Sequence, residues 1–139
     1  MPDGTYGLEC ERILYRLPDI LTRKADNFVW VCEGEKDADN LAGHGLVATT
    51  TGAASSWNAT DTTPLHGAWG IVVVPDCDAA GQMFSMSVAH TLVGKTKSIQ
   101  IIDLGGSQGY DVSDYLDEFG IGKLMMLRSN THQLSLIHI

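Results

Sequence analysis

The sequence predicts an α/β protein built on a parallel, Rossmann-like sheet of about four strands with helices on both faces. Short apolar runs rich in β-branched residues alternate with segments whose apolar residues recur at helical spacing. This alternation is typical of βαβ units, whose crossover helices cover both faces of a parallel sheet. The 139 residues, 44% of them hydrophobic, suffice for one domain around a single core.

The first half of the chain contains two predicted helices and two predicted strands. A short helix is expected in "LPDILTRKADN" (17–27), because Pro18 suits a first helical turn. "FVWVC" (28–32) is a short, continuous apolar run, as in a buried strand. "EKDADNLAGHG" (35–45) predicts a helix that ends at its last glycine, and "LVATTT" (46–51) predicts a second strand.

The second half repeats this alternation after a long connection. "GAASSWNATDTTPLHG" (52–67) is rich in turn-forming residues, so we expect a long connection with one helical turn. "WGIVVVPD" (69–76) predicts the third strand and "SIQIIDL" (98–104) the fourth. The intervening "AAGQMFSMSVAHTLVG" (79–94) has apolar residues at helical spacing, and "DYLDEFG" (114–120) begins a last helix.

We expect three parts along the chain. Residues 1–26 are interpreted as a linker that precedes the domain, and residues 27–120 as the domain itself. Residues 121–139 are interpreted as a truncated C-terminus, because "THQLSLIHI" (131–139) continues no pattern of the chain. Since "LSLIHI" is also what a common transposon-derived sequencing adaptor encodes in one reading frame, we expect 131–139 to be non-native.

The charge of the chain narrows its function. The formal net charge of -8 argues against a domain that grips DNA or RNA by charge alone, since phosphate contacts need Lys and Arg. Four of the nine basic residues fall in one N-terminal segment: Arg12, Arg16, Arg23 and Lys24. The rest of the chain is therefore still more acidic. An acidic domain can act on nucleic acid if its carboxylates hold divalent cations that face the phosphates.

Cysteine content and hydropathy indicate the compartment. Cys10, Cys32 and Cys77 are odd in number and form no CxxC pair, so we expect neither disulfides nor a structural zinc site. A reducing cytoplasm is the simple inference. No apolar run approaches the ~20 residues that span a bilayer and no signal peptide opens the chain, so no membrane partner is expected.

Acidic residues follow three of the predicted strands. Glu33 comes directly after "FVWVC", and Asp76 and Asp78 come after "GIVVV". Asp111 and Asp114 lie in the loop after "SIQIIDL". If the first and third strands are neighbours, Glu33 and the first aspartate pair meet at one end of the sheet, where ligands of such sheets bind. Crowded carboxylates repel one another unless a cation neutralises them, and Mg²⁺ suits a site of carboxylates, water and phosphate.

Each aspartate also has a simpler interpretation. Asp78 is well placed to cap the following helix, and Asp76 could be a turn residue. For an isolated Asp-x-Asp this interpretation is the better one. Glu33 favours the metal site, because a carboxylate beside an apolar strand is costly unless it is paired or metal-bound. For Asp111 and Asp114 a helix start and a metal site are equally supported.

Two stretches resemble the TOPRIM domain shared by primases, topoisomerases and some nucleases: "VWVCEGEKDADNLAGHGLVATTTG" and "WGIVVVPDCDAAGQ". That family has a Glu-Gly after its first strand and an Asp-x-Asp after its third, which match Glu33 and the pair Asp76 and Asp78. "EGEKDA" and "PDCDAAG" are especially similar to primases and primase-helicases of phages and mobile elements. "YDVSDYL" and "RILYRLPDIL" resemble further segments of those proteins, so the resemblance covers roughly residues 12–119.

The chain departs from the family at a few positions. Cys77 stands between the aspartates, where relatives often carry a small polar residue, and Tyr110 precedes Asp111, where a lysine is frequent. The loop at 52–57 lacks a basic residue that some relatives have. These differences concern the expected phosphate contacts and leave the carboxylates in place. Trp57, in the same loop, is either a core anchor or a base-stacking platform, and we favour the anchor.

The resemblance implies metal-dependent nucleotidyl transfer that extends an RNA primer on a DNA template. Glu33 would be a general base or a metal ligand, and Asp76 and Asp78 would hold one or two Mg²⁺ or Mn²⁺ ions. Asp111 and Asp114 are further candidates for metal binding.

The same resemblance extends to phosphate and nucleotide binding and to partners. Lys36 could reach a phosphate as a point charge, and Gly34 and Gly81 leave room for close backbone approach. The partners implied for the full-length protein are a single-stranded DNA template, ribonucleotides and a helicase domain or subunit. The fragment alone is expected to be inactive.

Three other classes remain open. A TOPRIM-type metal-dependent nuclease would use a similar set of carboxylates. A non-catalytic TOPRIM module would only bind metal or nucleic acid. A receiver-like signalling domain would need a phosphoacceptor aspartate after the third strand and a lysine after a fifth, and the sequence shows no clear fifth strand.

Overall fold

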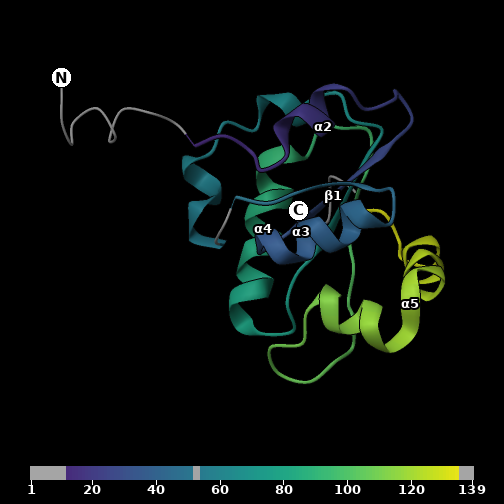
Figure 1. Cartoon of the computed structure of the whole chain (residues 1–139). Coiled ribbons are helices and arrows are strands. Elements are labelled where there is room, and N and C mark those ends of the chain that lie inside the picture. The colour runs from purple at the N-terminus through teal and green to yellow at the C-terminus, as the bar shows by residue number, and fades with distance from the viewer. Residues whose placement is uncertain (1–11, 52–53, 135–139) are drawn as a thin grey trace.

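The computed structural model describes residues 12–51 and 54–134, which form an α/β fold around one four-stranded sheet (Figure 1). The strands of this sheet are β1 (Phe28–Cys32), β2 (Val47–Thr49), β3 (Gly70–Val74) and β4 (Ile99–Ile101). The described helices are α2 (Leu17–Leu21), α3 (Glu35–Gly43), α4 (Ala79–Leu92) and α5 (Val112–Ser129), with the 3-10 helices η1 (Ala54–Ala59) and η2 (Thr63–Leu65). The predicted fold class is confirmed.

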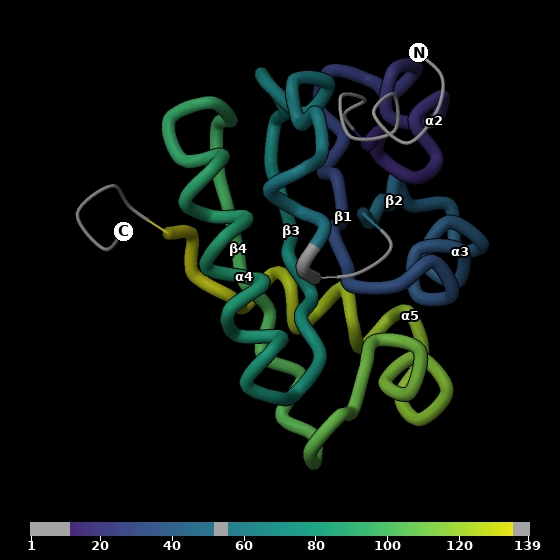
Figure 2. The backbone as a smooth tube through the Cα atoms, turned by 90° about the vertical axis from the view of Figure 1, so that its left-hand side faces the viewer, coloured from purple at the N-terminus to yellow at the C-terminus, as the bar shows by residue number. Residues whose placement is uncertain are grey.

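All neighbouring strands of the sheet are parallel, in the order β2-β1-β3-β4 (Figure 2). β1 and β3 pair along their whole lengths, from Phe28 opposite Gly70 to Cys32 opposite Val74. The two central strands therefore end at the same level, and the residues that follow them emerge next to each other at one edge of the sheet.

Side chains of the strands alternate between two apolar cores, one on each face. One core joins strand residues to α4: Val29, Val31, Ile71 and Val73 with Phe84, Val88 and Leu92. The other joins strand residues to α3 and α5: Trp30, Cys32, Val72 and Val74 with Leu41, Tyr115 and Leu124. All five residues of β3 are buried, as expected for a strand covered on both faces.

Several elements are shorter than the sequence predicts. β2 and β4 have three residues each, because they lie at the sheet edges and their flanking residues turn away into loops and helices. The helix expected at 17–27 ends at Leu21. The following residues turn instead, with the Lys24 N–H donating to Asn27 Oδ1 at 2.8 Å. None of the helices between residues 12 and 134 that the structure describes is long and apolar enough to cross a bilayer.

Trp57 packs the long connection between β2 and β3 against α4. Its side chain is 1% exposed, and its Nε1 donates a hydrogen bond of 3.0 Å to Thr91 Oγ1 of α4. Its ring meets the Phe84 ring edge-on, with centroids 6.1 Å apart. The preferred interpretation of Trp57 as a core anchor is confirmed, because a ring buried in this way is not available for base stacking.

The last helix bends and the chain then returns to the sheet. Gly120 has φ +84°, so the helical segment of α5 consists of two helices joined at a kink. After α5, the Leu134 N–H donates to the Ile99 carbonyl of β4 at 2.8 Å. Residues 131–134 of the segment expected to be non-native are thus tied to β4. The rest of that segment, 135–139, and residues 1–11 of the expected linker lie outside the described residues.

Candidate functional site

The carboxyl ends of β1 and β3 form the natural binding edge of this sheet. From β1 the chain runs through α3 to β2 on one side, and from β3 it runs through α4 to β4 on the other. The strand order therefore reverses between β1 and β3, and open parallel sheets bind ligands at such a switch point. Glu33 and Asp76 follow these two strands, so the topology brings both residues to that point.

Glu33 connects the ends of the two central strands. Its Oε2 accepts a hydrogen bond of 2.6 Å from the backbone N–H of Asp76. Burial raises the pKa of Glu33, and the Asp78 and Asp37 carboxylates raise it further, while the hydrogen bond from Asp76 opposes the rise. The structure thus places Glu33 in direct contact with the Asp-x-Asp loop.

Asp76 has a carboxylate with few partners. Its Oδ1 is buried and has no hydrogen-bond partner among the described residues. Burial raises the pKa of Asp76, and together with the charges of four nearby carboxylates it brings that pKa to about 7: Glu33, Asp37, Asp111 and Asp78. A positive charge beside Asp76 would therefore be strongly favoured.

Asp78 caps α4. Its Oδ1 accepts a hydrogen bond of 2.7 Å from the Gly81 N–H, and its own N–H donates to the Asp76 carbonyl at 2.9 Å. Gly81 packs so closely that an added Cβ would lie 2.1 Å from that carbonyl oxygen. The capping interpretation of Asp78 is the arrangement seen, and the close backbone approach at Gly81 is to Asp76. Because the cap uses one oxygen of Asp78, the other remains a candidate ligand.

Asp37 is a member of this acidic group that the sequence reasoning missed. It lies in the first turn of α3, four residues after Glu33, and it is only 5% exposed. Its Oδ1 accepts a hydrogen bond of 2.5 Å from the Ser113 hydroxyl, whose oxygen accepts another from Asn40 at 2.7 Å. Burial raises the pKa of Asp37, and the Ser113 hydrogen bond opposes the rise. No local signal in the sequence marks it, because its burial depends on the contact of α3 with Ser113.

Asp111 and Asp114 form a capping box at the start of α5. Asp111 Oδ1 accepts from the Asp114 N–H at 2.8 Å, and Asp114 Oδ2 accepts from the Asp111 N–H at 3.0 Å. The helix-start interpretation is therefore the one seen. Lys36 lies beside this capping box, with its Nζ 3.6 Å from Asp111 Oδ2 and 70% of its side chain exposed. At Gly34 an added Cβ would meet nothing within 4 Å, so there is open space beside it.

The donor types in this group suit a hard divalent cation, although the ligands are not preassembled. In the part of the chain that the structure describes, no three His, Cys, Asp or Glu side chains are arranged so that they could hold a metal ion together. Glu33 and Asp78 each turn one oxygen toward a backbone N–H instead. Their other oxygens and Asp76 Oδ1 are the donors that Mg²⁺ and Mn²⁺ prefer, so the residues fit such an ion in type and charge.

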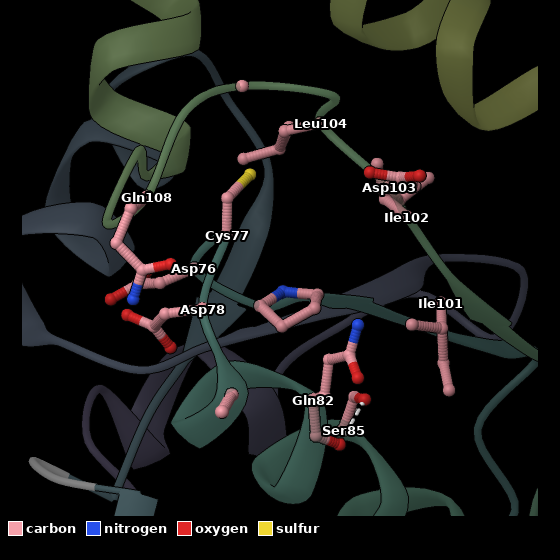
Figure 3. A pocket seen from close by; sticks show the side chains of 13 residues that line it. Asp76, Cys77, Asp78, Gln82, Ser85, Ile101, Ile102, Asp103, Leu104 and Gln108 are labelled. Carbon is pink, nitrogen blue, oxygen red and sulfur yellow. Dashed lines mark hydrogen bonds between the residues drawn. The ribbon is translucent and has the colours of Figure 1, made fainter.

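A cavity of about 520 Å³ opens beside the aspartates (Figure 3). It lies between the start of α4 and the loop after β4, at the carboxyl ends of β3 and β4. Asp76 and Asp78 line one side of it, so a ligand in the cavity would be adjacent to the acidic group.

Comparison with known proteins finds similarity in structure only. No family model matches the chain, and no curated protein matches it. The alignment with a structure of the DnaG catalytic core covers 88% of this chain and 41% of the DnaG chain, with 19% sequence identity and a TM-score of 0.61. The DnaG primase catalytic domain bound to single-stranded DNA has the same coverage and identity, with a TM-score of 0.60. The alignment with the zinc-binding and RNA polymerase domains of the Aquifex aeolicus primase covers 78% of this chain and 27% of the primase chain, with 19% sequence identity and a TM-score of 0.58.

These comparisons establish the fold. The four-stranded parallel sheet with helices on both faces has the architecture of part of the primase catalytic core. The chain spans less than half the length of each of these primase chains.

Proposed function

We propose that this chain is a TOPRIM catalytic module of a DNA primase or primase-helicase from a phage or mobile element. It would take part in RNA primer synthesis by metal-dependent nucleotidyl transfer during DNA replication. The observation that carries the proposal is Asp76, at the switch point of a primase-like fold. Its buried oxygen has no hydrogen-bond partner among the described residues, and its pKa is raised to about 7. Both properties suit a carboxylate that binds a divalent cation.

The proposed roles of the carboxylates follow from their contacts. Asp76 and Asp78 would hold Mg²⁺ or Mn²⁺, which when bound neutralises phosphate charge during phosphoryl transfer. Glu33 is a ligand or general base, and it also fixes the Asp76 backbone by its 2.6 Å hydrogen bond. Asp78 caps the first turn of α4 with one oxygen, which leaves its second oxygen as a candidate ligand. Asp37 adds negative charge from α3, and this charge raises the pKa values of Glu33 and Asp76.

Binding of the DNA template would depend on parts of the parent protein outside this module. The net charge of -8 disfavours phosphate binding by the chain itself. One of the similar structures is a primase domain bound to single-stranded DNA, which supports such a template as the partner of the parent protein. Ribonucleotides, a helicase domain or subunit, and a cytoplasmic setting complete the proposal.

A metal titration of the whole chain tests this function. Mn²⁺ binding is measured by paramagnetic broadening of NMR signals and by calorimetry for the wild type and Asp76→Asn. We expect weak binding by the wild type and a loss of about tenfold or more in the variant, since a ligand is removed. Asp114→Asn is the matched control, because this exposed aspartate belongs to the α5 cap.

Two outcomes would contradict the proposal. Unchanged Mn²⁺ affinity in Asp76→Asn would eliminate the metal site. Robust primer synthesis on single-stranded DNA by the isolated chain would refute the view that it needs further parts of a parent enzyme.

A further inference from the structure

The cavity beside the aspartates is lined by polar and apolar side chains in similar proportion. Its apolar lining includes Pro75, Ile101, Ile102 and Leu104. Asp76 and Asp78 lie on one side of it, and Gln82 and Gln108 contribute side-chain amides. A volume of about 520 Å³ is within the usual range of small-molecule sites.

The two amides are available to a ligand. The side chains of Gln82 and Gln108 make no hydrogen bond to any other described residue. Figure 3 shows Gln82 rising from α4 toward the middle of the cavity and Gln108 extending from the loop after β4. Each amide offers both a hydrogen-bond donor and an acceptor, which is the pattern that a hydroxyl group matches.

The loop after β4, which carries Gln108, is hydrogen-bonded to the Asp-x-Asp loop. The Cys77 N–H donates to the Tyr110 carbonyl at 2.9 Å, and the Gly109 N–H donates to the Cys77 carbonyl at 2.9 Å. The Tyr110 hydroxyl donates to Glu118 of α5 at 2.5 Å. The distance between Gln108 and the aspartates is therefore set by backbone hydrogen bonds, so the cavity is formed before any ligand binds.

The charge of the cavity limits which part of a ligand it accepts. Asp76, Asp78 and Asp103 line it, and no lysine or arginine is among the described residues that do. A bare phosphate inside it would be repelled. An uncharged group attached to a phosphate would fit, provided that the phosphate lies toward the aspartates and their cation. In a nucleotide, the group directly attached to the phosphate is the sugar.

We infer that Gln82 and Gln108 hydrogen-bond to the ribose of the bound nucleotide and select ribonucleotides over deoxyribonucleotides. This inference rests on the proposed function. In template-directed transfer the template chooses the base by pairing, but it does not read the sugar of the incoming nucleotide. Recognition of the 2′-hydroxyl therefore falls to the protein, and that hydroxyl is the group that distinguishes RNA from DNA precursors.

The test compares binding of ATP and dATP to the whole chain with saturating Mg²⁺, by NMR titration. We expect wild type to favour ATP by about fivefold for each hydrogen bond made to the 2′-hydroxyl. Gln82→Ala and Gln108→Ala should weaken ATP binding and leave dATP binding unchanged, so that the double variant binds both equally. Gln133→Ala, which removes an exposed glutamine that does not line the cavity, should retain the preference.

The outcomes separate this inference from the proposed function. Mg²⁺-dependent binding of ATP and dATP with equal affinity would overturn the sugar selection and leave the metal site intact. Equal weakening of both ligands in the glutamine variants would also overturn it, because it would indicate a structural role. Absence of Mg²⁺-dependent binding of either nucleotide would overturn both, and the Mn²⁺ titration of Asp76→Asn would then show whether the metal site itself had failed.

Discussion

Two acidic regions lie at the same edge of the sheet, one at the ends of β1 and β3 and one at the start of α5. In the α5 region, Asp111 and Asp114 each accept a hydrogen bond from the other's backbone N–H. In the strand-end region, Asp76 keeps a buried oxygen without a hydrogen-bond partner among the described residues, and burial together with nearby carboxylates raises its pKa to about 7. Similar residues thus serve helix capping in one place and remain available to a ligand in the other.

The difference lies in where the partners come from. The α5 pair is satisfied within four residues of chain, so its hydrogen bonds form together with the helix. Carboxylates from α3, from the end of β1 and from the α5 cap lie near Asp76 and raise its pKa, and no hydrogen bond from a described residue reaches Asp76 Oδ1. A carboxylate without local partners is the better candidate for a bound cation. The four experiments below test this contrast.

The largest effect on stability is expected from Gly81→Ala, which would disrupt the backbone packing of the strand-end region. The new Cβ would lie 2.1 Å from the Asp76 carbonyl oxygen, which is backbone and cannot simply move aside. We expect a loss of about 2–3 kcal/mol in the free energy of unfolding, measured by urea denaturation. Gly122→Ala in α5 is the matched control, because an added Cβ there meets nothing within 4 Å. It should raise stability by up to ~1 kcal/mol, and equal losses at the two sites would contradict the packing argument.

The second experiment follows the stability of the metal-free chain with pH. The pKa of Asp76 is raised from 3.8 to about 7 in the folded chain, so folding is favoured at low pH and this advantage is lost as pH rises between these values. Because the side chain is partly exposed, solvent screening limits the loss to on the order of 1–2 kcal/mol. Urea midpoints at pH 5 and pH 8 measure it.

Variants and metal sharpen this second test. Asp76→Asn should flatten the pH dependence, and added Mg²⁺ should restore wild-type stability above pH 7. Asp114→Asn, at the α5 cap, should keep the slope. If the slope is the same in Asp76→Asn as in the wild type, Asp76 is not its source.

The third change breaks the α5 region. Asp111→Ala removes the acceptor for the Asp114 N–H and should cost about 1 kcal/mol, the usual effect of losing a helix cap. The loss should be the same with and without Mg²⁺. Asp111→Asn retains a capping oxygen and should cost less. A Mg²⁺-dependent loss in Asp111→Ala would show that the α5 cap also takes part in cation binding.

The smallest effect is expected at Lys36, which lies between the two regions. Its Nζ is 3.6 Å from Asp111 Oδ2, but 70% of the side chain is exposed. Lys36→Gln should therefore leave the free energy of unfolding almost unchanged, and any difference from the wild type should shrink at high salt. Urea denaturation at two salt concentrations measures this. A clear loss of stability that persists at high salt would mean that this ion pair holds the two regions together.

The sequence predicted the meeting of Glu33 and Asp76 because strand ends and chain order suffice for it. Neighbouring parallel strands end at one edge, whatever their exact lengths. The capping roles of Asp78 and Asp111 were also open to prediction, since a cap needs only the next three residues. The lengths of the edge strands were not predictable, because pairing depends on neighbours distant in sequence.

Asp37 shows why part of the site could not be predicted. In the sequence it is one of several charged residues in a helix with Glu35 and Lys36, where solvent exposure is the usual outcome. Its burial depends on α5, whose Ser113 lies 76 residues later in the chain. Only the tertiary contact between α3 and α5 turns this aspartate toward the acidic group.

The position between the two aspartates is joined to the loop at 109–110 through its backbone. Both hydrogen bonds of residue 77 to the loop at 109–110 use main-chain atoms, so its side chain is not constrained by them. The thiol of Cys77 is partly exposed and lines the cavity, whereas Cys32 is buried, and burial raises the pKa of its thiol well above the ordinary value. A thiol-reactive fluorophore or spin label should therefore attach to Cys77 in preference to Cys32. The chain thus carries a built-in attachment point for a probe that reports cavity occupancy.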